Sequence, residues 1–593
     1  MELNYEKRKN TELFQTFQQK KFTFLSQLQN YIPIYRRFFA LNETNYNSIN
    51  LNHEWFLKDI KNVNYEIKHL YSCALQNVRT NDIKEKDVFF KMAPLLDPFK
   101  YIVGKYDSTD TALFNLPSYD TSLKVYPKIL DENNSAYVDG MFSYLSSTLL
   151  HKHGFLHAVD FYGGFLGIKN EFKLNVIDDL EYLCKSEFFN KNKNVLFEIE
   201  PYDHFFAKKP LVPIKISDNA ELLDIETFDD SVFEDIFEKE ERVKEITDST
   251  ILSLDDLVDM NTSDFIVNDT VNDTVNDTTN ESLKSMTTCS SRSSYTTASS
   301  ESNEEHNDEN ADSENNGIIE KQYYGSISSS ESSSDMLSDI SAEELYATIN
   351  NFPVQVICME YCENTFDSLI MKEDKLSHDE WFSALMQIIM ILITYQQVFS
   401  FTHNDLHTNN IMYNKTNKKF LYYCYEGKYY KVPTFGRIFK IIDFGRAIYK
   451  YNNMTFCSDS FKKDEDAHTQ YNCEPYFNEK KPRLEPNYSF DLCRLACSIF
   501  DYIVDDLEDI DNLKKCTPIV RLIVEWCLDD NGVNVLYKTN GDERYPEFKL
   551  YKMIARCVHK HTPQAQLKRK EFSAFIISKK NVPKDEAVMI IQF

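Results

Sequence analysis

Apolar residues recur along this chain with two different spacings, which predict helices in some segments and strands in others. Residues at helical spacing fill 136–151 and 379–401, and each run is long enough for a helix of several turns. Short apolar runs with the character of strands occur at 88–92 and 354–361. The mixture of the two patterns predicts an α+β fold.

The order of these patterns divides the chain into parts of different character. Apolar residues at helical spacing near the start, such as Phe14 and Phe17, predict a helical lead-in over residues 1–60. Residues 61–220 are predicted to be rich in strands with one main helix, and residues 351–593 to be mainly helical.

Residues 221–350 differ from the rest of the chain in composition. They contain three consecutive Val-Asn-Asp-Thr repeats and a Ser-, Glu- and Asn-rich tract. They hold 33 acidic and 6 basic residues, a net charge of −27 out of −28 for the whole chain. Such a segment cannot bury enough apolar surface to offset its ordering entropy, so we expect a long disordered insert. The remainder is nearly neutral, which argues against nucleic-acid binding.

Membrane insertion and secretion are not expected from the sequence. The segment 382–401 is the only one apolar enough to suggest a membrane span, but three glutamines and a threonine interrupt it. We interpret it as a buried core helix and predict no membrane association. The N-terminus has no apolar signal segment, and the 13 cysteines include no C-x-x-C pair. These features predict reduced thiols in a cytoplasmic, non-secreted protein.

Two short motifs carry the candidate chemistry. His403, Asp405 and Asn410 fit the pattern H-x-D-L-x-x-x-N, and Asp443 opens an Asp-Phe-Gly sequence 33 residues after Asn410. Phosphoryl transfer needs one carboxylate for the proton of the attacking hydroxyl. It also needs a second carboxylate and an amide oxygen to hold magnesium on the phosphates of ATP. Asp405 suits the first task, and Asp443 with Asn410 suits the second.

These motifs resemble the catalytic loop and the magnesium loop of the protein kinase superfamily, and are most similar to those of the serine/threonine kinases of giant DNA viruses. The resemblance implies a bilobal fold, with a β-rich N-lobe in 61–220 and a hinge with a mainly helical C-lobe in 351–593. It implies ATP and Mg²⁺ as cofactors and Ser/Thr hydroxyls of protein substrates as phosphate acceptors. Asp405 would be the proton acceptor, and Asn410 and Asp443 the metal ligands.

The resemblance also assigns candidate nucleotide-binding residues. The run 354–361 resembles the strand and hinge that hold adenine, with Met359 as gatekeeper and backbone groups of Glu360 and Cys362 pairing with the base. Lys91, in Val-Phe-Phe-Lys-Met, is the first candidate for the ATP-contacting lysine, and Lys124 is the second.

Two further acidic residues would support this site. Asp139 would be the helix partner of the ATP-contacting lysine, in place of the usual Glu. A predicted helix at 488–499 resembles the central helix whose Asp, here Asp491, anchors the backbone of the catalytic loop.

Several positions depart from the family pattern. No G-x-G-x-x-G loop precedes Lys91, and the corresponding stretch 70–78 offers Ser, Cys and Ala as its small residues. Asn404 replaces the usual Arg of the catalytic loop, and His407 stands where serine/threonine kinases usually have Lys. The gap before Asp443 is longer than usual, and we expect a hairpin at 422–430 with Gly427 in its turn.

Two other functions remain open on the sequence alone. Choline-kinase-like and aminoglycoside-kinase-like phosphotransferases share the first motif, although they usually lack the Gly that follows the metal-binding Asp. A pseudokinase scaffold would explain the missing glycine loop. Within the insert, 222–246 mixes acidic and apolar residues, so we expect either a solvated tether or a segment that folds on a basic protein partner.

Overall fold

The computed structural model describes residues 2–119, 122–202, 344–372, 375–510 and 512–592 as a mixture of helices and sheets. The mixed α+β class predicted from the sequence is therefore confirmed. Most of the predicted insert, residues 221–343, lies outside the described residues. Its predicted end at 350 is too late, because strand β9 already begins at Tyr346.

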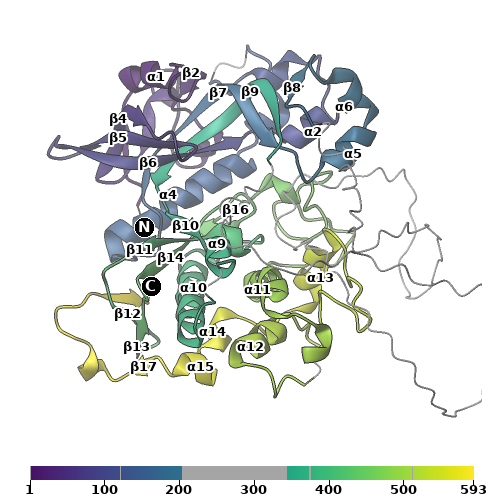
Figure 1. The fold of residues 1–593 in the computed structure, drawn as a ribbon. Coiled ribbons are helices and arrows are strands. Elements are labelled where there is room, and N and C mark those ends of the chain that lie inside the picture. Colours follow the sequence, from purple (N-terminus) through teal and green to yellow (C-terminus); the bar gives the residue numbers. More distant parts are fainter. Residues whose placement is uncertain (1, 120–121, 203–343, 373–374, 511, 593) are drawn as a thin grey trace, which may run out of the picture. The chain divides into compact units, whose positions relative to one another are not determined.

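A seven-stranded antiparallel sheet organises the first part of the fold (Figure 1). Long strands β7 and β9 pair at its centre, and seven consecutive residues of β9 from Pro353 to Met359 are buried. Since the side chains of both faces are covered, this run is apolar apart from the buried Gln355. In order across the sheet the strands are β2 (Leu25–Gln29), β7 (Phe161–Asn175), β9 (Tyr346–Glu360), β6 (Ile83–Pro94), β5 (Leu70–Asn77) and β4 (Trp55–Val63), with β8 (Phe197–Ile199) also on β9.

The helical lead-in predicted for residues 1–60 is wrong. This region contains one seven-residue helix, α1 (Thr11–Phe17), whereas Leu25–Gln29 forms β2 at the edge of the sheet. β4 also begins within it, and β1 (Tyr5–Lys7) pairs with β3 (Ile49–Leu51). Tertiary pairing with β7 overrides the local helical spacing, because apolar positions three residues apart can also reach a sheet core across a bulge. The register between β2 and β7 shifts at such an irregularity.

Helix α4 (Ser135–His153) is the main helix predicted in this part, and it packs against β7 and β9. Its start is fixed by Asn134, whose side chain accepts a hydrogen bond from the N–H of Ala136. Its end is fixed by Gly154 at φ 64°, in the left-handed conformation that glycine adopts easily. The smaller helices that belong to this part are α2 (Pro98–Ile102), α3 (Pro127–Leu130), α5 (Leu180–Lys185) and α6 (Glu187–Asn192).

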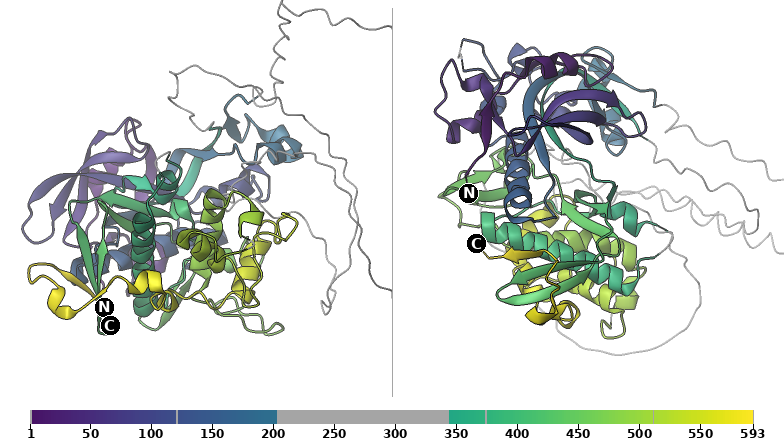
Figure 2. Two further views of the ribbon diagram at one scale, coloured as in Figure 1. Left: turned by 60° about the horizontal axis from the view of Figure 1, so that its bottom comes forward. Right: turned by 90° about the vertical axis from the view of Figure 1, so that its left-hand side faces the viewer.

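The second part of the fold is built around helix α10 (His378–Phe399), which lies next to α14 and β14 (Figure 2). A capping box between Ser377 and Glu380 starts this helix. It is the one helix among the described residues that is long and apolar enough to cross a membrane, and 89% of its apolar window is buried. Gln387, one of the polar residues that interrupt the window, accepts from the N–H of Phe439 at 3.2 Å.

The described residues of this part form six further helices, and α11 packs against α12 and α13. They are α9 (Phe366–Ile370), α11 (Phe490–Ile503), α12 (Pro518–Trp526), α13 (Lys549–Cys557), α14 (Pro563–Gln566) and α15 (Lys570–Ser573). Short 3₁₀ helices occur at Pro33–Arg37, Tyr46–Ser48, Thr111–Phe114, Thr408–Asn410, Asp459–Phe461, Leu507–Ile510 and Lys579–Asn581.

Three small sheets lie among these helices, so this part is less uniformly helical than predicted. The predicted hairpin is present, with Gly427 at φ 73° between β12 and β13. The sheets are β10 (Asn364–Thr365), β11 (Ile411–Lys415) and β14 (Arg437–Ile441); β17 (Ile576–Ile577), β13 (Lys428–Pro433), β12 (Phe420–Tyr425) and β18 (Val588–Ile591); and β15 (Ile448–Tyr451) with β16 (Met454–Cys457).

An aromatic cluster around Phe142 connects the two parts. Phe142 lies on α4 and is fully buried, and its ring contacts five other rings at centroid distances of 4.4 to 5.3 Å. The partners come from α10, the segments after α10 and β14, and β15: Tyr395, Phe399, Phe401, Phe444 and Tyr449. The segment that carries Asp443 is therefore packed directly against the helix that carries Asp139.

Phe142→Ala tests the role of this cluster in stability. Removing the ring should destabilise the protein by about 3–5 kcal/mol, because the five surrounding rings cannot collapse fully into the cavity. The measurement is the midpoint of urea unfolding, monitored by tryptophan fluorescence. Tyr65→Ala is the control, because Tyr65 is 92% exposed. Equal midpoints for the two variants would contradict this assignment.

Candidate functional site

Asp405 lies on the loop between α10 and β11, and a buried carboxylate holds this loop in place. Asp491, near the start of α11, accepts the backbone N–H groups of His403 and Asn404, both at 2.9 Å. Each carboxylate oxygen takes one of them, so two buried donors are satisfied by one side chain. Asp491 therefore anchors the loop as the sequence suggested.

Asn404, which stands where the motif of protein kinases usually has Arg, has a structural role in this loop. Its φ of 64° is left-handed, a conformation that Asn tolerates better than most residues. Its side chain donates to the carbonyl of Arg446 at 3.0 Å and accepts from the hydroxyl of Tyr471 at 2.8 Å. The loop is thereby tied to the segment that follows Asp443.

Asp443 lies just beyond the end of β14, at a sharp change of backbone direction. Its φ is 64°, and the preceding carbonyl, of Ile442, accepts a hydrogen bond from Nε2 of His403 at 2.9 Å. The next side chain, Phe444, enters the aromatic cluster and contacts Phe142 at 4.6 Å. Burying Phe444 turns the carboxylate of Asp443 outward, where its side chain is 49% exposed.

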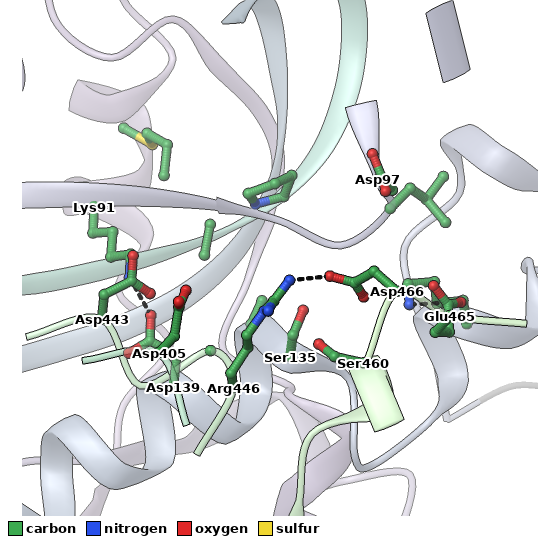
Figure 3. Close-up of a pocket in the computed structure, with 17 residues that line it drawn as sticks. Lys91, Asp97, Ser135, Asp139, Asp405, Asp443, Arg446, Ser460, Glu465 and Asp466 are labelled. Atoms are coloured by element: carbon green, nitrogen blue, oxygen red, sulfur yellow. Dashed lines mark hydrogen bonds and ion pairs between the residues drawn. The ribbon is translucent and has the colours of Figure 1, made fainter. Parts of the chain in front are cut away.

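Lys91 joins the sheet, α4 and the Asp443 segment through one ammonium group (Figure 3). Its Nζ lies 2.6 Å from Asp139 Oδ2 and 2.8 Å from Asp443 Oδ1. The other oxygen of Asp139 accepts the backbone N–H of Phe444 at 3.0 Å. The structure thus brings together Lys91, Asp139 and Asp443 as expected, and the shorter Asp side chain in place of Glu still reaches the lysine.

Lys124, the second candidate, lies elsewhere. Its side chain is 77% exposed and pairs with Asp110 at 2.9 Å. It therefore has no contact with the group around Lys91.

The charges of Lys91, Asp139 and Asp443 shift one another's pKa values. Burial acts to lower the pKa of Lys91, but the adjacent carboxylates of Asp139 and Asp443 raise it above its ordinary value. Burial raises the pKa of Asp139 even though Lys91 opposes the shift. For Asp443, burial also acts upward, but the charge of Lys91 is stronger and lowers the pKa. At neutral pH the site holds a charged lysine and an ionised Asp443.

Asp405 is surrounded by groups that stabilise its negative charge. The hydroxyl of Tyr551, on α13, donates to Asp405 Oδ1 at 2.7 Å. Burial alone would raise the pKa of Asp405, but the charges of Arg446, His407 and Arg494, with the hydrogen bond from Tyr551, lower it to about 2. Asp405 is therefore a carboxylate at neutral pH and can accept a proton.

His407 contributes little of that positive charge at neutral pH. Burial lowers the pKa of its imidazole to about 4, so the ring is neutral there. Its Nδ1 is buried without a hydrogen-bond partner among the described residues. The two guanidinium groups are therefore the permanent charges next to Asp405.

Asn410 is held so that its amide oxygen is the group left for a ligand. Its Nδ2 donates to the backbone carbonyl of Asp405 at 2.9 Å. Orienting the NH₂ in this way leaves the oxygen as an acceptor or metal ligand. No group of three or more His, Cys, Asp and Glu side chains in the described parts of the chain is arranged to hold a metal ion.

The predicted hinge lies at the end of β9, and one of its backbone N–H groups already donates a hydrogen bond within the protein. Met359 and Cys362 are buried, and the N–H of Glu360 donates to the carbonyl of Asp160 at 2.8 Å. The Glu360 carboxylate accepts from Lys440 at 3.0 Å and from Asn414 at 2.9 Å. Pairing of an adenine with Glu360 through its N–H is therefore excluded, which leaves its carbonyl and the backbone of Cys362.

A cavity of about 200 Å³ opens beside these groups (Figure 3). Lys91, Asp139, Asp405, Asp443 and Arg446 all line it. Met359, Glu360, Cys362 and Asn410 do not belong to this wall. The cavity thus collects the charged residues of the candidate site but not the predicted adenine contacts.

The far wall of the cavity is held by ion pairs. The segment 459–466 follows β16, and its acidic side chains pair with basic residues from both parts of the fold. Lys128 lies 2.7 Å from Asp459 and 3.0 Å from Glu465, and Arg446 pairs with Asp466. Asp459 also accepts the N–H of Ser135 at the start of α4, a favourable place for a carboxylate.

The stretch 70–78, predicted to replace the glycine loop, is not a loop. Residues Leu70–Asn77 form β5, which pairs on both sides. The turn that connects β4 to β5 is 64–69, which contains no glycine. The prediction placed the turn one strand too late because Ser, Cys and Ala are as compatible with a central strand as with a turn.

Three residues of the site were not found from the sequence. Arg446 directly follows the Asp-Phe-Gly motif, and Arg494 lies three residues after Asp491 on α11, so both positions carried a local signal. Tyr551 carried none, because it lies 146 residues from Asp405 in the chain.

Comparison of the chain with models of known protein families and with curated protein sequences gave no match. The assignment of function below therefore depends on the motifs and on the geometry of the site.

Asp491→Ala tests the anchoring of the loop. The substitution leaves two buried N–H groups without an acceptor, at a cost of about 1–3 kcal/mol each. Hydrogen exchange followed by mass spectrometry should show the amides of His403 and Asn404 exchanging about 10-fold faster or more. The exposed Asp585→Ala is the control. Unchanged protection of both amides would contradict the anchoring role.

Asp97 lies in the wall of the same cavity and makes the free energy of unfolding of the protein depend on pH. It caps α2 by accepting the N–H groups of Phe99 and Lys100, and burial raises its pKa from 3.8 to about 7. The folded protein binds this proton more tightly than the unfolded chain, so stability falls as pH rises from about 4 to 7.

Asp97→Asn keeps a capping oxygen and removes the charge, since Asn caps helices as well as Asp does. The difference in melting temperature between the variant and the wild type should grow in favour of the variant from pH 5 to pH 8. An equal difference at both pH values would contradict the raised pKa.

Proposed function

We propose that this chain is an ATP- and magnesium-dependent protein kinase that transfers the γ-phosphate of ATP to Ser or Thr hydroxyls of proteins. The observation that carries the proposal is the double ion pair of Lys91, at 2.6 Å from Asp139 and 2.8 Å from Asp443. A strand lysine, a helix acid and the metal-binding Asp are the parts that must be in place together in a protein kinase.

The order of elements around Lys91 supports the proposal. Lys91 lies on the third strand of the β4-β5-β6 meander, and its acidic partner lies on the long helix α4 that follows. The protein kinase lysine likewise lies on the third strand, and its partner lies on a helix. The sheet with α4 would be the N-lobe of a bilobal fold, and the part built around α10 and α11 would be the C-lobe.

The donor atoms around Asp443 fit magnesium. Asp443 offers a partly exposed carboxylate, and Asn410 offers an oriented amide oxygen. Magnesium prefers oxygen ligands and is commonly held by one or two carboxylates together with the phosphates of the substrate. Asp443 and Asn410 would hold the ion, which supplies charge neutralisation at the phosphates when bound.

The side chains of the protein would bind the phosphates and orient the acceptor hydroxyl. Lys91 would bind phosphate oxygens, and its ion pair with Asp139 fixes the position of its ammonium group. Asp405 would orient the acceptor hydroxyl and take its proton as the oxygen attacks the γ-phosphorus, and ADP would leave from the opposite side. The low pKa of Asp405 suits orientation of the hydroxyl more than early removal of its proton.

The intact Asp443-Phe444-Gly445 sequence supports a protein substrate over a small molecule. The described cysteines form no disulfide bond, and a reduced cytoplasmic setting is part of the proposal. The acidic residues 222–246 are proposed to meet a basic protein partner.

Transfer of radiolabelled γ-phosphate to a generic basic protein and to the chain itself tests the function. Asp405→Asn should reduce transfer about 100-fold or more because the acceptor hydroxyl loses its base. Asp443→Ala should abolish magnesium-dependent transfer, while both variants keep the fold by circular dichroism. Asp585→Asn, at an exposed site, should transfer at the wild-type rate.

Three outcomes would contradict the proposal in different ways. Wild-type protein that binds ATP but phosphorylates only small hydroxyl compounds would be a small-molecule phosphotransferase. Folded wild-type protein that binds no ATP would be a scaffold. Transfer that persists in Asp405→Asn would remove Asp405 from its assigned role.

A further inference from the structure

Tyr551 lies on α13, far from both motifs in the sequence, yet its hydroxyl donates to Asp405 Oδ1 at 2.7 Å. Asp405 is the side chain on which the proposed phosphate transfer depends. The hydrogen bond fixes one of the two carboxylate oxygens and leaves the other to meet an acceptor hydroxyl. A carboxylate tied in this way cannot rotate freely about its last torsion.

The ring of Tyr551 is itself held firmly. It stacks on Phe548 at a centroid distance of 5.1 Å with an interplanar angle of 13°, and it contacts Phe490 of α11 at 6.1 Å. The guanidinium groups of Arg494 and Arg446 lie 5.1 and 5.6 Å from the ring centroid, within the range of cation–π attraction. The hydroxyl is therefore presented to Asp405 by a ring whose own position is set by packing.

The catalytic loop itself offers Asp405 little comparable support. His407 stands where a lysine would provide a charged donor, and its Nδ1 has no hydrogen-bond partner among the described residues. Asn404, in place of the usual Arg, is turned toward Tyr471 and the carbonyl of Arg446. The hydrogen-bond donor to Asp405 comes instead from outside the loop, from Tyr551 on α13.

We propose that Tyr551 is a positioning residue that holds the carboxylate of Asp405 in the orientation needed to receive the acceptor hydroxyl. The inference rests on the proposed kinase function and deepens it. It gives α13 a part in the active site, although the helix belongs to neither motif. A misplacement of a reacting group by about 1 Å can cost on the order of 100-fold in rate, so one such hydrogen bond has a measurable effect.

Tyr551→Phe in the full-length chain is the test, because it keeps the ring and removes only the hydroxyl. We expect kcat for phosphate transfer to fall on the order of 10- to 100-fold, with KM for ATP and the melting temperature nearly unchanged. Tyr537→Phe is the matched control, since the Tyr537 hydroxyl donates to Asp501 at 2.8 Å, away from the site. This control should keep the wild-type kcat.

A double-mutant cycle separates positioning from a general structural effect. If Tyr551 acts through Asp405, adding Tyr551→Phe to Asp405→Asn should change the residual rate less than two-fold. A full additional loss in the double variant would overturn the inference.

The other outcomes are equally informative. An unchanged kcat in Tyr551→Phe, beside an active wild type, would overturn the positioning role and leave the kinase function standing. An increased kcat would also overturn it, because the phenol would then be blocking the acceptor position. A wild type that transfers no phosphate would refute the proposed function and this role together.

Discussion

The candidate site depends above all on one ammonium group that is shared by two carboxylates. Lys91 lies on a central strand, and its two ion pairs reach a helix and a loop that are distant in the sequence. Removing the carboxylate of Asp139 or of Asp443 would leave the ammonium group of Lys91 with only one of its two negative partners. Because each partner is fixed by its own element, the bridge sets the spacing between the sheet, α4 and the Asp443 segment.

Around this bridge, apolar packing positions Asp443, and buried hydrogen bonds position the loop that carries Asp405. The ring of Phe444 is held among Phe142 and other aromatic side chains, so Asp443 must turn the opposite way. Asp491 satisfies two backbone donors of the loop that carries Asp405.

Two positions that depart from the pattern of the protein kinases have other charged or polar groups around them. Asn404 cannot pair with an anion as an Arg would, and the segment 459–466 is instead held by its own carboxylates against Lys128 and Arg446. His407 is neutral, and two arginines with one tyrosine surround Asp405 in its place.

The sequence by itself determined the features whose signal is local. Helices α4 and α10, the strand of Lys91, the Gly427 turn and the two motifs were all found, because periodicity and turn chemistry act over a few residues. The N-terminal strands, the ion pairs of Lys91 with Asp139 and Asp443, and the contact of Tyr551 with Asp405 were decided only by the tertiary structure. These depend on pairing and packing between segments tens to hundreds of residues apart, and a pattern along one segment holds no information about its distant partner.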